Sequence, residues 1–119
     1  MAILIARHGE TDDNAKRIIQ MPTSPLSITG NEQAKHLAQR LTGMNITRII
    51  SSDYERAKQT ALLAGGLSDV VVEFNIALRE QNFGDLRGRA YDDLDTSPFT
   101  SDYQPSNGEN WSVFCERVA

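Results

Sequence analysis

Apolar and polar positions along residues 1–74 follow a pattern that predicts strand, helix, strand, helix, strand. Short apolar runs predict strands over 3–6, 47–51 and 70–74. The first run is apolar at every position, which is typical of a strand buried on both faces of a parallel sheet. Because strands that alternate with helices form parallel sheets through right-handed crossovers, we predict an α/β fold.

Two stretches between these strands carry apolar or small residues at helical spacing. The first predicted helix begins with a capping-box spacing at Thr29 and can end at Gly43. Its inner face consists of Ala34, Leu37, Ala38 and Leu41. The second follows the capping-box spacing of 52–55; its inner face consists of Ala57, Thr60, Ala61 and Ala64. Because this second face is small-sided, we expect that helix to lie close to the sheet.

The rest of the chain is less regular. Residues 75–110 contain three glycines and two prolines and predict mostly loop, with one helical turn near 91–94. From Asn110 a helical pattern returns, with Trp111, Phe114, Cys115 and Val118 on one face. No strand follows, so the three predicted strands would leave open sheet edges. We therefore expect residues 1–119 to be a single domain, truncated at its C-terminal side, and its open edge predicts pairing into a homo-oligomer.

Composition narrows the class of protein. The chain has 119 residues, 39% hydrophobic and 24% charged, as in ordinary globular domains. Its formal net charge of −4 gives no overall attraction to nucleic acid or to anionic lipid. It has one cysteine and no run near the roughly 20 apolar residues that a membrane span needs. These features predict a cytoplasmic protein with neither a membrane nor a nucleic acid as partner.

The clearest candidate for chemistry is Arg7-His8-Gly9, directly after the first predicted strand. Ligands of parallel α/β sheets gather at the carboxyl ends of the strands. A neutral histidine with one free ring nitrogen can act as a covalent nucleophile, and an arginine can bind phosphate oxygens through two N–H groups. The residues alone leave a second interpretation open, a structural histidine that hydrogen-bonds the strand end.

Two later residues could complete such a site. Arg56 lies in the first turn of the second predicted helix, where its charge and the helix dipole both favour an anion. Glu80 follows the third predicted strand, beside Arg79 and Phe83, and partial burial there would suit a general acid. The plain alternatives are a solvated arginine and a surface carboxylate.

Other polar residues are weaker candidates for a functional site. Asp92, Asp93 and Asp95 lack the glycine and closing glutamate of an EF-hand loop, so we predict solvated carboxylates and no metal site. His36 lies on the first predicted helix, away from the strand ends, which is typical of a surface histidine. Phosphate-loop, dinucleotide, serine-hydrolase and dithiol motifs are absent, and we predict no cofactor.

Four groups of residues, taken in order, carry a family resemblance. They are Arg7-His8-Gly9-Glu10-Thr11 with Asn14; Ser24-Pro25-Leu26-Ser27 with Gly30, Gln33 and Ala34; Ser51-Ser52-Asp53 with Arg56, Ala57, Gln59, Thr60 and Ala61; and Leu78-Arg79-Glu80 with Phe83, Gly84 and Gly88. Together they resemble the histidine phosphatase superfamily, in its phosphoglycerate mutase-like branch. The resemblance implies a three-layer α/β sandwich with a mostly parallel sheet.

The resemblance also implies roles for individual residues. It implies His8 as the nucleophile that becomes phosphohistidine and Glu80 as the proton donor to the leaving oxygen. It implies Arg7, Arg56 and Asn14 as contacts to the phosphate of a small phosphorylated metabolite. Members of the family carry a second His-Gly pair on a later strand, and this sequence ends before such a pair.

We therefore predict a metal-independent phosphomonoester hydrolase. Two alternatives stay open. One is phosphoryl transfer of the phosphoglycerate mutase type, which shares the first step. The other is an inactive or truncated member of the family that binds phosphate esters.

Overall fold

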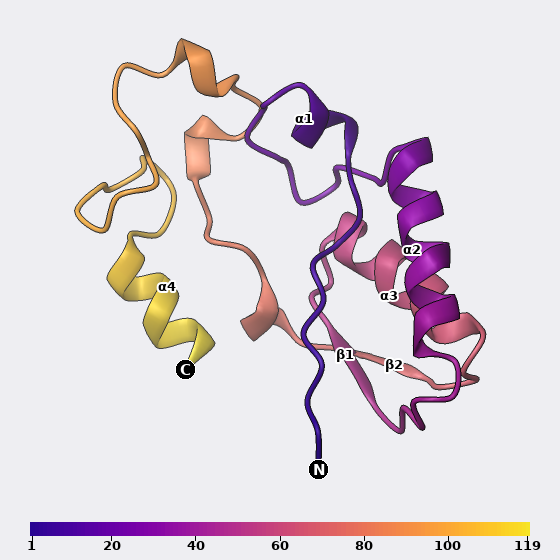
Figure 1. Ribbon diagram of the computed structural model, residues 1–119. Coiled ribbons are helices and arrows are strands. Elements are labelled where there is room, and N and C mark those ends of the chain that lie inside the picture. Colours follow the sequence, from indigo (N-terminus) through magenta and orange to yellow (C-terminus); the bar gives the residue numbers. More distant parts are fainter.

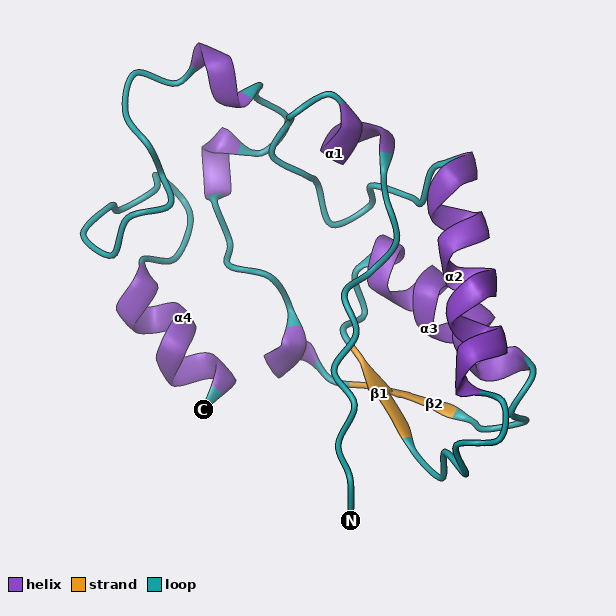
Figure 2. Ribbon diagram, in the orientation of Figure 1, coloured by secondary structure: helices purple, strands orange, loops and turns teal.

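The computed structural model, which describes residues 1–119, contains four α-helices and a small parallel sheet (Figures 1 and 2). The helices are α1 (Asp12–Ala15), α2 (Ile28–Leu41), α3 (Glu55–Gly66) and α4 (Trp111–Val118); the strands are β1 (Ile49–Ser51) and β2 (Val72–Phe74). Three short 3₁₀ turns follow β2, at Ile76–Leu78, Gly84–Leu86 and Tyr91–Asp93. None of the helices has the length and apolar character needed to cross a bilayer.

The two strands pair in parallel, as the alternating pattern predicts. Ile49 lies opposite Val72, and Ser51 lies opposite Phe74. Helix α3 connects the two strands and packs on the sheet. A Cβ on Gly65 would lie 3.1 Å from Ile49 Cδ1, so the absence of a side chain at Gly65 lets α3 approach the sheet closely. The α/β class and the parallel pairing are therefore confirmed.

Helix α2 packs on α3 through small residues. Ala34 and Ala38 of α2 and Ala61 and Ala64 of α3 are all buried. The predicted helix boundaries hold to within a few residues, but both predicted caps are wrong. Ser27, two residues before Thr29, caps α2 by accepting a hydrogen bond from the Gly30 amide at 3.0 Å.

The start of α3 differs from its predicted capping box as well. Tyr54 occupies the N-cap position and its side chain makes no capping bond. The Ser52 hydroxyl accepts from the Tyr54 amide at 3.1 Å, but Ser52 lies two residues before the N-cap position and does not cap the helix. A capping-box spacing in the sequence thus predicts where a helix begins to within a few residues, but it does not identify the residue that caps the helix.

The predicted strand over 3–6 is wrong in this structure. These residues are extended but pair with no other strand, and Ile3 and Ile5 are 78% and 96% exposed. A strand buried on both faces needs hydrogen-bonded neighbours and a covering layer, and β1 and β2 pair only with each other. The apolar pattern of residues 3–6 favours a buried strand, but residues 1–119 provide no strand that pairs with it.

Residues 75–110, predicted as mostly loop, are irregular but packed. Ile19, Phe83 and Leu86 form a buried cluster, covered by Tyr91, Leu94 and Tyr103. The Phe99 ring meets the rings of Phe83 and Tyr91 edge-on, with centroids 5.4 and 5.3 Å apart. The helical turn predicted near 91–94 is confirmed as the 3₁₀ turn at Tyr91–Asp93.

Gly30 provides a test of the packing between the N-terminal segment and α2. A Cβ on Gly30 would overlap the backbone of Glu10. We expect Gly30→Ala to lower the free energy of unfolding by about 2 kcal/mol, as overpacking does, in urea denaturation followed by circular dichroism. Gly66→Ala is the control, because nothing lies within 4 Å of its Cβ position and alanine favours helix. Equal effects of the two substitutions would contradict this account.

Candidate active site

The backbone around His8 is held from two helices. The Gly9 amide donates to Thr60 Oγ1 of α3 at 3.0 Å, and the Glu10 amide donates to Gln33 Oε1 of α2 at 2.8 Å. A Cβ on Gly9 would overlap the Gly30 carbonyl oxygen, so this segment lies directly on the first turn of α2. His8 is therefore presented from a backbone that α2 and α3 fix.

The ring of His8 is fixed by a hydrogen bond to the backbone of the next residue. Its Nδ1 lies 2.7 Å from the Gly9 carbonyl oxygen. Because a carbonyl oxygen can only accept, Nδ1 carries the hydrogen. In the neutral ring the lone pair is then on Nε2, which makes no hydrogen bond within the protein.

Burial and neighbouring charges favour the neutral form of that ring by lowering the pKa of His8. Burial lowers the pKa of His8 most strongly, because it disfavours the imidazolium. The hydrogen bond to Gly9 opposes this, and the positive charges of Arg56 and Arg7 lower the pKa of His8 further. The charge of Glu80 raises it slightly. The charges of Arg7, Arg56 and Glu80 therefore all act on His8.

Arg56 is buried, in contrast to the solvated arginine that its sequence position alone allows. It lies in the first turn of α3 and is 4% exposed. One Nη1–H donates to the Met21 carbonyl at 2.9 Å, and its other N–H groups make no hydrogen bond within the protein. Burial lowers the pKa of Arg56, and the charge of Glu80 opposes that shift. A buried guanidinium with free donors is a ready binding group for an oxyanion.

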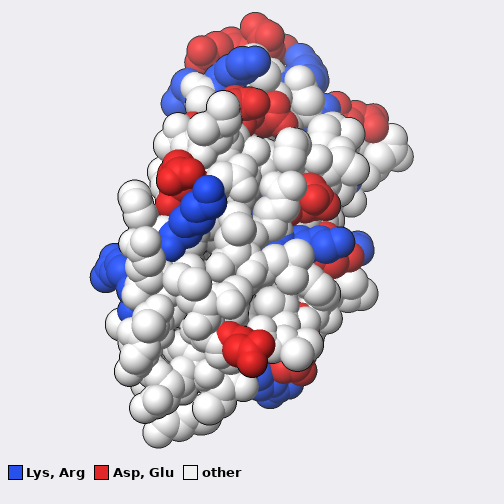
Figure 3. Space-filling view, turned by 90° about the vertical axis from the view of Figure 1, so that its right-hand side faces the viewer, with Lys and Arg blue, Asp and Glu red and all other residues white.

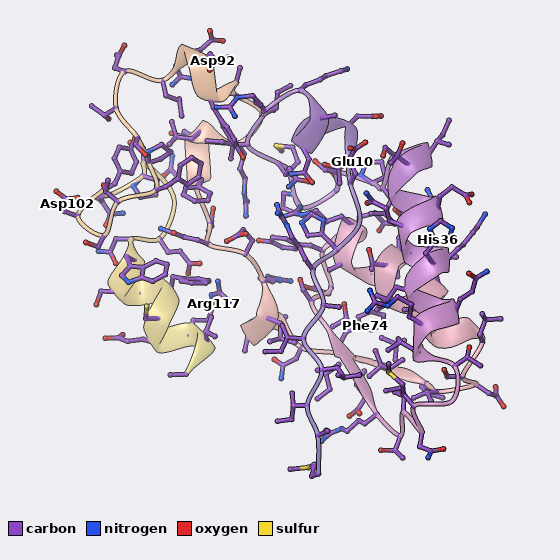
Figure 4. All side chains as sticks on the ribbon, viewed as in Figure 1. Glu10, His36, Phe74, Asp92, Asp102 and Arg117 are labelled. Atoms are coloured by element: carbon purple, nitrogen blue, oxygen red, sulfur yellow. The ribbon has the colours of Figure 1, made fainter.

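The other predicted residues take different positions. Arg7 and Glu80 are exposed, so the partial burial expected for Glu80 is not observed; its Oε1 accepts from the Gln81 amide at 2.9 Å. Asn14 is half-buried and its Oδ1 accepts from the Thr11 amide at 3.4 Å, in a capping box of α1. His36 is exposed on α2, as predicted (Figure 4).

Charged groups outside the site form no extended field on the face that Figure 3 shows. Positively charged lysine and arginine side chains and negatively charged carboxylates are interspersed there. This face therefore provides no extended positive patch that would attract an anion.

A cavity of about 310 Å³ borders the nucleophile candidate. Its lining includes Arg7, His8, Gly9 and Thr60, with Gln33 and Leu37 from α2. This volume lies within the range of small-molecule sites, roughly 300–1,000 Å³.

Sequence reasoning missed Arg117, which ties α4 to the segment that carries Glu80 (Figure 4). The Arg117 guanidinium binds the Glu109 carboxylate at 2.6 and 3.2 Å. It also donates, at 3.0–3.3 Å, to four carbonyl oxygens, those of Ile76, Ala77, Arg79 and Glu80. Glu109 in turn accepts from the Asn82 amide at 3.0 Å. The sequence carries no signal for this pair, because the two residues are eight positions apart and Glu109 precedes α4.

Comparison with known proteins identifies the family. The family model for the histidine phosphatase superfamily, branch 1, matches residues 3–119. The chain belongs to this superfamily. The resemblance carried by the four groups of residues is thereby confirmed, and it extends over α4, which those groups do not include.

Relatives within the histidine phosphatase superfamily have several named activities. The chain is 34% identical over 128 residues to the probable phosphoglycerate mutase GpmB of Salmonella arizonae, an alignment that covers 99% of this chain and 60% of that protein. A mycobacterial glucosyl-3-phosphoglycerate phosphatase, solved with VO3, superposes with a TM-score of 0.83 at 31% identity, covering 93% of this chain and 57% of that one. The α-ribazole phosphatase from Shigella flexneri superposes with a TM-score of 0.83 at 30% identity, and the alignment covers 94% of this chain and 60% of that one. The chain thus spans about 60% of the length of these three histidine phosphatases.

The state of His8 can be measured directly. We expect a ¹H–¹⁵N NMR titration to show a neutral ring with its hydrogen on Nδ1 and a pKa of His8 below the ordinary 6.5, because burial disfavours the imidazolium. Arg7→Gln should raise that midpoint, because a nearby positive charge is removed; Arg7 is exposed and forms no hydrogen bond whose loss would disturb the fold. A midpoint above 6.5 in the unaltered protein would refute this description.

The Arg117 contacts predict a large stability effect for one surface-proximal helix residue. We expect Arg117→Met to lower the free energy of unfolding by about 2 kcal/mol, because Glu109 and four carbonyls lose a charged donor. Arg117→Lys should recover only part, since a lysine has no planar fork. Arg40→Met on α2 is the matched control, being exposed and without such contacts. Urea denaturation that ranks Arg117→Met with Arg40→Met would count against the proposed network.

Proposed function

We propose that this protein is a metal-independent phosphomonoesterase in which His8 is the nucleophile. The observation that carries the proposal is the fixed neutral ring of His8, whose Nδ1–H is occupied by Gly9 at 2.7 Å while the lone pair of Nε2 is free. Relatives named as phosphatases and as a phosphoglycerate mutase support the reaction class. Because the chain spans about 60% of these relatives, the proposal concerns the activity of the whole protein.

The first step forms a phosphoenzyme. The Nε2 lone pair of His8 attacks phosphorus as the bond to the leaving oxygen breaks. Glu80, in its protonated form, gives its proton to that oxygen, and the alcohol departs. The charge of Glu80 acts on both His8 and Arg56, which supports a position near the transferred group.

The second step releases phosphate. A water molecule attacks the phosphorus of phosphohistidine while the Glu80 carboxylate accepts its proton. The P–N bond breaks, and its electron pair returns to Nε2 of His8. The neutral ring and protonated Glu80 are thereby restored.

The cations stabilise the charge of the transferred group. Arg56 offers free N–H groups from a buried position, where a hydrogen bond to an oxyanion is stronger than in water. Arg7 is exposed at the mouth of the His8 cavity and adds a second positive charge. We assign the remaining phosphate contact to the Asn14 amide, whose nitrogen makes no hydrogen bond within the protein while its oxygen caps α1.

A second candidate, a phosphoglycerate mutase, is favoured by the name of the Salmonella relative. It shares the phosphohistidine step but returns the phosphoryl group to another hydroxyl of the bound acid. Product analysis separates the two, since a mutase interconverts isomers and a phosphatase releases inorganic phosphate.

The test compares leaving groups. We expect hydrolysis of p-nitrophenyl phosphate and of glycerol phosphate without added metal, and loss of both in His8→Asn. Glu80→Gln should lower kcat for glycerol phosphate by about a hundredfold, since a poor leaving group needs the proton donor, and should affect p-nitrophenyl phosphate much less. Glu116→Gln is the control, an exposed carboxylate on α4.

A trapped intermediate gives an independent readout. Quenching at alkaline pH during turnover should leave a phosphoryl group on His8, detected by mass spectrometry of the peptide. Turnover that survives in His8→Asn, or a phosphoryl group on a different residue, would contradict the proposal that His8 is the nucleophile.

A further inference from the structure

Glu80 lies in a segment that no helix or strand supports. It falls between two of the 3₁₀ turns, and its side chain is exposed. No backbone amide donates to the carbonyl oxygen of Arg79 or of Glu80. The one hydrogen bond of the Glu80 carboxylate within the protein is the one that Oε1 accepts from the Gln81 amide. Neither regular structure nor burial fixes Glu80, so its position depends on what holds the backbone around it.

Arg117 supplies the missing donors from the last turn of α4. Its Nη2 donates to the carbonyl oxygens of Arg79 and Glu80 at 3.0 and 3.3 Å. Its Nη1 donates to those of Ile76 and Ala77 at 3.2 and 3.1 Å. A guanidinium can bind carbonyls spread over five residues because its N–H groups point outward from a rigid plane, whereas a lysine offers a single nitrogen.

Glu109 holds the guanidinium of Arg117 in this orientation. Its carboxylate accepts from Nη2 of Arg117 at 2.6 Å and from Nε at 3.2 Å. The hydrogen bond from Arg117 lowers the pKa of Glu109, although partial burial opposes that shift, so the carboxylate is ionised at neutral pH. Glu109 also binds the segment directly, because its Oε1 accepts from the Asn82 amide at 3.0 Å and its own amide donates to the Asn82 carbonyl at 2.8 Å. Residues 76–82 are thus fastened to both ends of α4.

The same segment is anchored to the start of α3. The Arg79 guanidinium binds the Asp53 carboxylate at 2.7 and 2.6 Å. It also lies 5.3 Å from the centre of the Tyr54 ring, whose hydroxyl accepts from Arg87 at 2.7 Å. Helix α3 carries the buried Arg56 in its first turn. Arg79 is therefore tied to α3 by its side chain and to α4 by its carbonyl, and the next residue is the proposed proton donor.

We propose that Arg117, oriented by Glu109, is a positioning residue that holds the Glu80 carboxylate within reach of the leaving oxygen at His8. This inference rests on the proposed function of the His8 site. A proton donor acts only within hydrogen-bond distance of the atom that it protonates, so a shift of the backbone at 76–80 weakens proton transfer and leaves the nucleophile in place. Arg117 acts through the backbone alone.

Two leaving groups test the proposal in the whole protein. Arg117→Lys keeps the positive charge but loses the planar fork. We expect it to lower kcat for glycerol phosphate by about tenfold, because that leaving group needs the proton donor, and to change kcat for p-nitrophenyl phosphate by less than about twofold. In the Glu80→Gln background, Arg117→Lys should have no further effect on either substrate, because the donor that it positions is already lost.

The titration of His8 gives a readout that needs no turnover. The charge of Glu80 raises the pKa of His8, so Glu80→Gln should lower the midpoint of His8 measured by NMR. Arg117→Lys conserves charge and should also lower this midpoint, because it frees Glu80 to move away from His8. In the Glu80→Gln background, the same substitution should leave the midpoint unchanged.

Two further variants complete the experiment. Arg40→Lys, at an exposed arginine on α2, is the control and should change neither the kcat values nor the midpoint of His8. Glu109→Gln keeps an acceptor for the Asn82 amide but removes the charge that orients Arg117, and it should lower kcat for glycerol phosphate selectively as well. Circular dichroism checks that each variant is folded, and Glu109→Gln replaces Arg117→Lys if the latter does not fold.

The possible outcomes separate this proposal from the proposed function. An Arg117→Lys effect that is equal for both substrates, or that persists undiminished in the Glu80→Gln background, would overturn the positioning role and leave Arg117 a residue of stability alone. Hydrolysis that survives in His8→Asn would instead refute the proposed function of His8. In that case, the response of the His8 midpoint to Arg117→Lys still decides whether Arg117 positions Glu80.

Discussion

The backbone of Gly9 and Glu10 lies on the first turn of α2 so closely that neither Gly9 nor Gly30 has room for a side chain. This contact fixes where the loop after residue 7 can run. The hydrogen bonds that the Gly9 amide donates to Thr60 and the Glu10 amide donates to Gln33 then hold the loop to α3 and α2. Thr60 has a second task, since its hydroxyl donates to the Arg56 carbonyl at 2.8 Å while it accepts from Gly9. One hydroxyl therefore couples the His8 backbone to the turn that carries the buried arginine.

The buried guanidinium of Arg56 lies near the neutral ring of His8. This arrangement costs electrostatic free energy in the unliganded protein but favours the binding of an anion. Burial disfavours the charged forms of both groups and so lowers the pKa of each. Arg56 stays charged because an arginine loses its proton only far above neutral pH, whereas the His8 ring stays neutral. In the reaction that we propose, an incoming phosphate dianion supplies the negative charge that Arg56 lacks, and it meets a ring nitrogen whose lone pair is free. The unliganded arrangement is thus prepared for an anion.

Much of the fold could be predicted from the sequence because its helices follow periodic patterns. The small faces of α2 and α3 and the crossover to a parallel strand are local in origin, and the structure has them. The strand over 3–6 failed for the opposite reason: its burial depends on neighbours that apolar residues cannot specify by themselves. Helix α1 was not predicted, since its four polar residues offer no apolar period and its capping pair is the only signal.

The site divides in the same way. His8 and Arg56 could be found because each follows a strand or opens a helix, positions at which α/β folds bind ligands. The contacts of Arg117 with Arg79 and Glu80, and that of Arg87 with Tyr54, join residues 33 to 38 positions apart. No periodicity encodes such contacts, which form only when irregular segments pack together. Burial is equally hard to read from sequence, as the buried Arg56 and the exposed Glu80 show.

The contact between Arg117 and the Glu80 segment also sets an order of events during synthesis. A ribosome makes Glu80 well before it makes Arg117, which comes 37 residues later. While the chain grows, α2, β1, α3 and β2 can assemble from residues already made, but the carbonyls at 76–80 still lack their guanidinium. The carboxylate that we assign to proton transfer therefore gains its full support only when the last turn of α4 has left the ribosome. Until that moment, a nascent chain can hold the nucleophile that we propose, His8, before the segment of the proposed proton donor has its last contacts.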